Sequence, residues 1–335
     1  MTTTDFVQKN LRTVVKTPEE IKRDRMMDNL LNDDLSMLTP YLDEPNVTDI
    51  AIVDSGEIIV SRFRKGREFT NIEMPDYIAE RIVKATAAIY GKSLDSSSGF
   101  PVLEGIIPKY LARITALMPP TVCRPELQIR KPPSVIYSLE DYLRNGEMTQ
   151  DQYDMIVQYI KERKNIVVAG GTGSGKTTCT NAILKKMAEF TPDDNFYIVE
   201  DTPELQCNAR MKTMIWCSKE FAYKAVEESL RFSPDRIIFG EVRSGDVMVE
   251  ILEAWSSGHS GNVTTIHAND GIGTLRRIKG LLGKDNLFLV DDISEVVNLV
   301  VHMKKSKDGV RVDELFPVSK GTESFLAGLE NNNLA

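Results

Sequence analysis

GGTGSGKTT, residues 170 to 178, is the stretch of sequence that decides the fold of this chain. It matches the pattern GxxxxGK[ST] at every fixed position. Glycines let backbone N–H groups turn toward a phosphate, Lys176 supplies a full positive charge, and the Thr177 hydroxyl can ligate Mg²⁺. The pattern therefore predicts a site for a nucleoside triphosphate, with contacts from Gly171, Thr172, Gly173, Ser174, Gly175, Lys176, Thr177 and Thr178.

The segments on either side of this loop support that interpretation. Residues 165–169 (NIVVA) are apolar and rich in β-branched residues, which is typical of a buried strand. Residues 177–190 place Ile183, Leu184 and Met187 on one face, as in a helix. A chance glycine-rich turn that contains a lysine is disfavoured, because strand, loop and helix follow in the required order.

The length of the chain indicates about two globular domains, and its composition is that of an ordinary globular protein. The chain has 335 residues, of which 41% are hydrophobic and 27% charged. No apolar stretch approaches the roughly 18 residues of a membrane span, and the N-terminus lacks the apolar core of a signal peptide, so a cytoplasmic location is expected. The four cysteines form no CxxC pair, and neither a zinc site nor a disulfide framework is predicted.

The formal net charge of −8 argues against a free surface that binds nucleic acid through its phosphates. Direct sequence-specific binding of nucleic acid is therefore not expected. A locally basic pore in an assembly remains compatible with this charge.

Residues 1–45 are predicted to form an N-terminal helical arm. Thr17, Pro18 and Glu20 have the pattern of a helix start with a capping box. Residues 6–16 alternate apolar and basic side chains, which leaves two interpretations open. They form either a short amphipathic segment that contacts anionic lipid or a partner, or a frayed terminus.

Residues 46–131 are predicted to form a smaller α+β domain. Residues 47–53 and 58–60 have the pattern of a hairpin around a Ser55-Gly56 turn. A helix is expected over 74–90, ended by Gly91, and further strands at 106–107, 112–117 and 127–129. Residues 132–144 begin with prolines and are assigned to a linker.

Residues 145–335 are predicted to form one α/β nucleotide-binding domain of the P-loop type. Apolar strand candidates alternate with helical stretches and recur at 166–168, 196–199, 237–239 and 263–266. This alternation predicts a mainly parallel sheet with helices on both faces and the ligand at the carboxyl ends of the strands.

Polar residues follow each of the later strand candidates. Glu200-Asp201-Thr202 follows the second, Gly240-Glu241-Val242-Arg243 the third, and His267-Ala268-Asn269 the fourth. Phosphoryl transfer to water needs a metal ion, a cationic clamp and a group that positions the nucleophile, which these side chains can supply.

Four blocks of this sequence resemble motifs of a known family, the hexameric traffic ATPases of type II and type IV secretion. The blocks GGTGSGKTT, VEDTPEL, SPDRIIFGEVRSGD and GHSGNVTTIHAND resemble the Walker A, Asp box, Walker B and His box, in that order. Residues 47–50 and 127–131 resemble the TrbB-like branch of conjugative-transfer ATPases. The resemblance implies a RecA-like ATPase domain, a homohexameric ring, ATP and Mg²⁺ as cofactors, and channel components at the inner membrane as partners, with peripheral membrane contact as an option.

The resemblance also implies roles for single residues. Lys176 and Thr177 would bind the β- and γ-phosphates and Mg²⁺, and Glu200 would position or deprotonate the attacking water. Glu241 would support the metal or that water, and His267 would sense the γ-phosphate. Arg113 and Arg130 would reach the phosphates from the smaller domain. Because the third core strand ends in Gly240-Glu241 without an Asp, the division of labour between Glu200 and Glu241 stays open.

Three other residues have a structural and a functional interpretation. Arg243 is either a salt-bridge partner or a finger acting on a neighbouring subunit. His259 is a weaker candidate for shaping its glycine-flanked turn, and His302 is assigned to structure.

The predicted function is Mg²⁺-dependent ATP hydrolysis that powers type IV secretion or conjugative transfer. The alternatives are a type IV pilus-type extension or retraction ATPase and a nucleotide-dependent assembly scaffold with little turnover. An ATP-driven nucleic-acid motor is disfavoured by the acidic balance.

Overall fold

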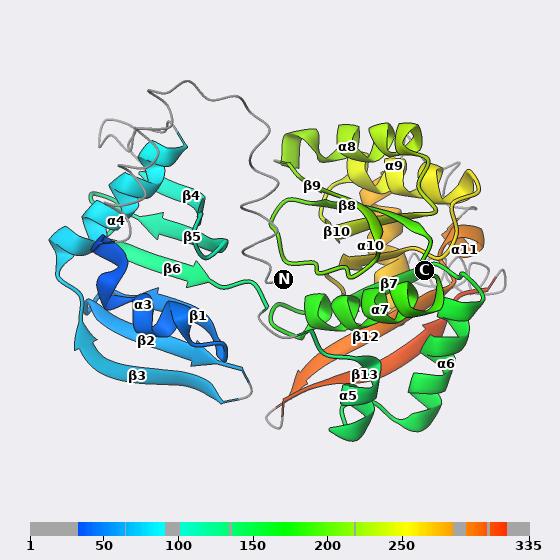
Figure 1. The fold of residues 1–335 in the computed structure, drawn as a ribbon, viewed down its shortest axis with the longest axis horizontal. Coiled ribbons are helices and arrows are strands. Elements are labelled where there is room, and N and C mark those ends of the chain that lie inside the picture. The colour runs from blue at the N-terminus through cyan, green and yellow to red at the C-terminus, as the bar shows by residue number, and fades with distance from the viewer. Residues whose placement is uncertain are drawn as a thin grey trace, which may run out of the picture. The chain divides into compact units, whose positions relative to one another are not determined.

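The computed structural model describes residues 33–63, 65–90, 101–133, 136–217, 219–283, 293–306 and 309–319. The predicted helix start at Thr17 and the amphipathic segment 6–16 lie outside these residues, as does Gly91. The chain divides into two compact units, Met1–Val135 and Ile136–Ala335. Each unit has its own sheet (Figure 1).

The first unit is an antiparallel sheet with a helix packed on it. The strand order is β3-β2-β1-β6-β5-β4, and every neighbouring pair is antiparallel. Its described elements are η2 (Leu35–Met37), α3 (Thr39–Asp43), β1 (Val47–Ile52), β2 (Glu57–Arg62), β3 (Gly66–Glu73), α4 (Asp76–Ile89), β4 (Val102–Ile107), β5 (Ala112–Leu117) and β6 (Glu126–Arg130).

The predicted hairpin, helix and three strands of this unit are confirmed. Strand β3 was not predicted, because nearly all its residues are exposed and its sequence shows no buried alternation. The N-terminal helical arm was predicted to include residues 1–45, and this range extends too far toward the C-terminus. Leu35, Leu38 and Leu42 are buried in the same core as β1 and α4, so this segment is part of the first unit.

The second unit is an α/β domain around a seven-stranded sheet. Its described elements are α5 (Leu139–Arg144), α6 (Gln150–Lys161), β7 (Ile166–Gly170), α7 (Lys176–Phe190), β8 (Asn195–Glu200), β9 (Met211–Trp216), η4 (Lys219–Phe221), α8 (Ala222–Ser229), η5 (Leu230–Phe232), β10 (Arg236–Val242), α9 (Gly245–Ser256), β11 (Val263–Ile266), α10 (Gly271–Leu282), α11 (Ile293–Val296), β12 (Leu299–Ser306) and β13 (Gly309–Pro317). The strand order is β13-β12-β7-β11-β10-β8-β9. All neighbouring pairs are parallel except β12 and β13. The mainly parallel sheet is therefore confirmed.

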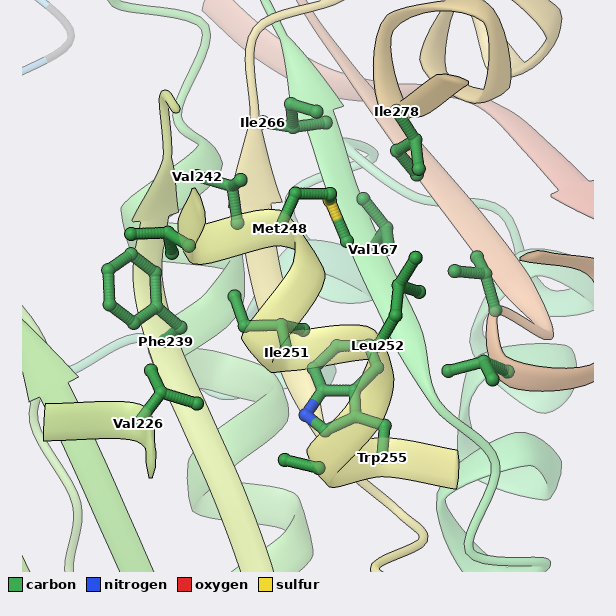
Figure 2. Packing of buried hydrophobic residues seen from close by; sticks show 14 of the residues in the cluster. Val167, Val226, Phe239, Val242, Met248, Ile251, Leu252, Trp255, Ile266 and Ile278 are labelled. Carbon is green, nitrogen blue, oxygen red and sulfur yellow. The ribbon is translucent and has the colours of Figure 1, made fainter. Parts of the chain in front are cut away.

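The sheet has a hydrophobic core on each face, because alternate residues of its strands point to opposite sides. On one face, Val167 and Tyr197 belong to a cluster that includes α8, α9 and α10. Figure 2 shows Met248, Ile251 and Leu252 of α9 within this core. On the other face, Ile166 and Phe196 pack with α5, α6 and α7. The prediction of helices on both faces is confirmed.

The predicted linker, residues 132–144, contains a helix. Ser138 caps α5: its hydroxyl accepts a hydrogen bond from the Asp141 N–H, and Asp141 accepts one from the Ser138 N–H. Leu139 and Tyr142 are buried in the core of the second unit. This short helix was not predicted, because the prolines before it indicated a linker and the capping box at its start went unrecognised.

Two buried asparagines join strands at the amino-terminal edge of the parallel sheet. The Asn165 side-chain oxygen accepts hydrogen bonds from the N–H and the amide of Asn262, both at 3.0 Å. The Asn262 oxygen accepts a hydrogen bond from the Ile237 N–H at 2.7 Å. These contacts connect the starts of β7, β10 and β11, which lie at the opposite edge from the glycine-rich loop.

Candidate functional site

The glycine-rich loop connects β7 to α7, the strand and helix predicted around it. Gly173 and Gly175 have φ values of 69° and 87°, a region that favours glycine. Gly170 has φ 153°, and a Cβ there would lie 2.4 Å from the Met303 carbonyl oxygen. The loop therefore needs glycine at these positions, for backbone conformation and for close approach to β12.

Lys176 is the first residue of α7, and its side chain folds back toward the glycine-rich loop. Its ammonium group donates hydrogen bonds to the carbonyl oxygens of Gly170, at 3.1 Å, and Gly171, at 3.0 Å. Its Nζ also lies 3.4 Å from Nδ1 of His267. Although the lysine is largely buried, Gly171 and Thr172 at the loop tip are exposed. A charged amine thus lies beneath an open loop that can receive an anion.

The loops after β10 and β11 meet through a second set of contacts. Nε2 of His267 lies 2.7 Å from Oε1 of Glu241. The other Glu241 oxygen accepts hydrogen bonds from Arg243, which also donates to Asp201 at 2.7 Å. The structure therefore brings Glu241 and His267 together with Lys176, and it joins the loop after β8 to them through Arg243.

Glu200 differs from the other predicted acidic residue. Its side chain is only 3% exposed, and its Oε1 accepts hydrogen bonds from the N–H groups of Glu204 and Leu205. Its Oε2 is buried without a hydrogen-bond partner among the described residues. Burial raises the pKa of this carboxyl to about 8, although the two N–H groups oppose that shift. Glu200 lies inside the protein and not on the open face of the loop.

Glu204 is a site residue that was not predicted from the sequence. Its Oε2 accepts a hydrogen bond from the Thr177 hydroxyl at 3.1 Å. The block VEDTPEL contained this signal, since it has a second glutamate four positions after Glu200. Proximity in sequence to the end of β8 favoured the first glutamate, whereas the path of the loop brings the second one to α7.

The residues at the start of α7 fit a magnesium ion bound together with a nucleotide. Mg²⁺ is commonly held by one or two carboxylates, a hydroxyl and the phosphates of its substrate. Thr177 supplies the hydroxyl and Glu204 an adjacent carboxylate, while Glu241 is engaged by His267 and Arg243. Within the described ranges no group of three or more His, Cys, Asp or Glu side chains could hold a metal ion alone. This donor set suits a metal that arrives with phosphates.

Arg113 and Arg130 belong to the first unit, on neighbouring strands β5 and β6. They are direct register partners, and Arg130 donates a hydrogen bond to Asp49 at 2.9 Å. Arg113 pairs more loosely with Glu104, at 3.9 Å. Like charges at directly opposite positions repel one another. The unit thus presents two cations side by side, and their contact with phosphates stays a prediction.

The other two histidines have surroundings of different kinds. Nδ1 of His259 lies 3.2 Å from the Ala254 carbonyl oxygen, at the turn after α9. His302 is buried in β12, with Nδ1 3.7 Å from Asp313. His259 thus lies against its own turn and His302 within a pair of strands, in keeping with the structural interpretations.

The fold and these loops define a class of protein: an α/β domain with a glycine-rich loop and converging polar side chains at the carboxyl edge of a mainly parallel sheet. A family model described as "Type II/IV secretion system protein" matches residues 105–313. The chain belongs to this family. In the part of the chain that the structure describes, no helix is both long enough and apolar enough to cross a membrane.

Curated relatives agree with this assignment. The chain is 33% identical over 298 residues to a probable conjugal transfer protein TrbB of Sinorhizobium fredii, covering 88% of this chain and 90% of the relative. It is 34% identical over 296 residues to the conjugal transfer protein TrbB of Rhizobium radiobacter, with the same coverage of both chains. The predicted resemblance to the TrbB-like branch is confirmed.

Solved structures share the fold. The ATPase DotB of Legionella pneumophila has a TM-score of 0.60 at 19% identity, covering 90% of this chain and 83% of that chain. The pilus retraction motor PilT with bound ADP also has a TM-score of 0.60, at 17% identity, covering 89% of this chain and 88% of that one.

Proposed function

We propose that this chain is a Mg²⁺-dependent ATP hydrolase that powers type IV secretion or conjugative transfer. Family membership and the TrbB relatives support a role in such a system. The observation that carries the proposal is the series of contacts between the four loops. Lys176 contacts His267, His267 contacts Glu241, and Arg243 links Glu241 to the loop after β8.

These residues can act on a triphosphate in complementary ways. Phosphate oxygens would accept hydrogen bonds from the loop N–H groups and from Lys176, whose ammonium group now donates to loop carbonyls. His267, close to both Lys176 and Glu241, would sense the terminal phosphate. Glu241 is held by His267 and Arg243, which orients its carboxylate for a water molecule or metal-bound ligand. Mg²⁺, when bound, would neutralise charge on the phosphates.

The proposal includes a ring and a place of action. A homohexamer of RecA-like domains would use contacts to the terminal phosphate to drive domain closure and opening. Arg113 and Arg130 would reach the phosphates of ATP as the domains close. The ring would act on the cytoplasmic side of the inner membrane, against components of a secretion or conjugation channel, with peripheral membrane contact.

Steady-state phosphate release tests the enzymatic part of the proposal. Wild type is expected to release phosphate from ATP in a Mg²⁺-dependent manner, and Lys176→Ala to lose about 10²-fold or more, because it removes a charge that stabilises the transferred group. Lys164→Ala is the matched control, since Lys164 is exposed before β7. An assembled wild type that releases no more phosphate than Lys176→Ala would contradict hydrolysis and favour an assembly scaffold.

A further inference from the structure

The loop after β8 contains two glutamates whose surroundings suit different tasks. Glu200 ends the strand and points into the protein, and Glu204 lies half-buried in the loop. Both belong to the VEDTPEL block, in which the first glutamate was predicted to act on the attacking water. The contacts of the two side chains argue that the second glutamate, and not the first, faces a bound nucleotide.

Glu200 holds the loop by its backbone. Its Oε1 accepts hydrogen bonds from the Glu204 N–H at 3.0 Å and from the Leu205 N–H at 2.7 Å. These N–H groups follow the end of the strand, so the carboxyl group acts as a local cap. This contact fixes the backbone of Glu204 and leaves Oε1 of Glu200 occupied.

The neighbouring strand provides the space that Glu200 fills. Gly240 of β10 has no side chain, and a Cβ at that position would lie 3.1 Å from Cγ of Glu200. The Glu200 side chain therefore packs against the backbone of β10, which excludes solvent from it. A group that is 3% exposed and packed in this way is suited to positioning its own loop.

Glu204 faces the start of α7. Its Oε2 accepts a hydrogen bond from the Thr177 hydroxyl at 3.1 Å. Asn181, one turn further along α7, donates to the Glu204 carbonyl at 3.1 Å and accepts from the Gln206 N–H at 2.8 Å. The loop is thus attached to α7 at Glu204 itself and again at Gln206, which limits the positions that the Glu204 carboxylate can take.

The direction of the hydrogen bond between these residues matters for a cation. A hydroxyl that donates its proton to a carboxylate keeps the lone pairs of its own oxygen for another partner. Thr177 and Glu204 therefore present two oxygens side by side next to the glycine-rich loop. Hydroxyl and carboxylate oxygens are ligands that Mg²⁺ accepts together with phosphate oxygens.

We infer that Glu204 is the carboxylate that, with Thr177, receives the divalent cation of the nucleotide, and that Glu200 is a positioning residue that holds the Glu204 loop. This assignment rests on the proposed function, since it concerns the metal that accompanies ATP. It adds Glu204 to the site and moves Glu200 from the reaction to its support.

Nucleotide binding with and without Mg²⁺ tests the assignment independently of turnover. A fluorescent, slowly hydrolysed ATP analogue is titrated into the full chain, in excess EDTA and in excess Mg²⁺, and the ratio of the two dissociation constants is compared between variants. Glu204→Gln is expected to reduce this Mg²⁺-dependent gain about tenfold or more, because it removes the carboxylate, and to leave the affinity in EDTA within about twofold. Glu204→Asp is expected to restore part of the gain.

Glu200→Gln gives the contrasting result. The amide oxygen still accepts both backbone N–H groups, so the Mg²⁺-dependent gain is expected to stay within about twofold of wild type. Asp193→Asn, an exposed carboxylate before the start of β8, is the matched control and is expected to change neither affinity. Circular dichroism and thermal unfolding of each variant establish that it is folded.

The outcomes separate this assignment from the proposed function. A Glu204→Gln variant that keeps the full Mg²⁺-dependent gain would overturn the assignment, as would a folded Glu200→Gln variant that loses it. Either result leaves ATP binding by wild type intact. Failure of wild type to bind the analogue at all would overturn the proposed function and the role of Glu204 with it.

Discussion

Arg243 donates hydrogen bonds to carboxylates from two loops, with Nη1 2.7 Å from Asp201 and Nε 2.8 Å from Glu241. A planar guanidinium can hold two carboxylates in fixed orientations, which a lysine cannot do. These contacts are those of a salt bridge within the chain, one of the two interpretations that the sequence left open. The side chain is 38% exposed, so the pairs contribute little to stability and act mainly on orientation.

Arg243→Gln is expected to lower phosphate release about tenfold or more, because Glu241 loses a partner that orients it. The free energy of unfolding is expected to change by less than about 1 kcal/mol, since exposed ion pairs are weak. Phosphate-release assays and urea denaturation of the same preparations measure the two effects. Arg144→Gln, which removes the exposed pair with Asp141, is the control. An unchanged rate in Arg243→Gln would contradict the orienting role.

At the scale of secondary-structure elements, a polar cluster joins three helices on one face of the sheet. Glu140 of α5 accepts hydrogen bonds from Lys186 of α7, at 2.6 Å, and from the Tyr153 hydroxyl of α6, at 2.7 Å. Burial opposes ionisation of Glu140, but the contacts with Lys186 and Tyr153 outweigh it and lower its pKa to about 2. The cluster therefore ties the helix found within the predicted linker to the second unit.

This cluster predicts a pH-dependent contribution to stability. Because the pKa of Glu140 is lower in the folded state, its stabilisation is fully present above its ordinary value of 4.5 and is lost as the pH falls toward about 2. Glu140→Gln is expected to cost about 1 kcal/mol at pH 7, a modest value because the side chain is 39% exposed. Urea denaturation at pH values from 7 to about 3 measures the difference, which is expected to shrink below pH 4.5.

Glu189→Gln provides the comparison, since Glu189 also pairs with Lys186 at 2.6 Å but lies in the same helix, α7. Its cost is expected to be smaller than that of Glu140→Gln. A Glu140→Gln difference that grows as the pH falls from 4.5 would show that the sign of the argument is wrong.

The starts of three parallel strands depend on Asn262. Its side chain is fully buried, accepts a hydrogen bond from the Ile237 N–H and donates to the oxygens of Asn165 and His259. An apolar residue at this position would leave a buried backbone N–H without its partner, which typically costs about 1–3 kcal/mol. This edge of the sheet thus relies on polar contacts that a hydrophobic pattern does not reveal.

Asn262→Ala is expected to lower the free energy of unfolding by about 2–4 kcal/mol, as several buried hydrogen bonds are lost together. Urea or thermal denaturation measures this effect. Asn208→Ala, which changes an exposed asparagine, is expected to have little effect. Equal stability of the two variants would mean that Asn262 is replaceable at this edge.

At the scale of the whole molecule, the proposed ring makes a prediction about assembly. Sedimentation of wild type is expected to show a larger species in the presence of a non-hydrolysable ATP analogue and Mg²⁺, because a ring that binds nucleotide more tightly than the monomer is favoured by mass action. Lys176→Ala, with its phosphate contact removed, is expected to respond less. A monomer with and without nucleotide would count against the ring.

The architecture was largely predictable because the parallel strands are buried on both faces and therefore appear in the sequence as short apolar runs. This reasoning located β7, β8, β10 and β11 and the edge of the sheet at which the loops meet. It failed for β3, whose residues are nearly all exposed and show no buried alternation, and it did not predict β9, β12 or β13. The strands of the first unit with a clear apolar pattern were found.

The sequence by itself determined the glycine-rich loop, its flanking strand and helix, and the family, because these depend on residues that are adjacent in the chain. Only the tertiary structure decided that Glu200 is buried against β10 and that Glu204 contacts Thr177. The exposure and direction of a side chain result from packing between segments that are distant in sequence. Two glutamates four positions apart in one motif thus acquire different surroundings, which composition and spacing cannot distinguish.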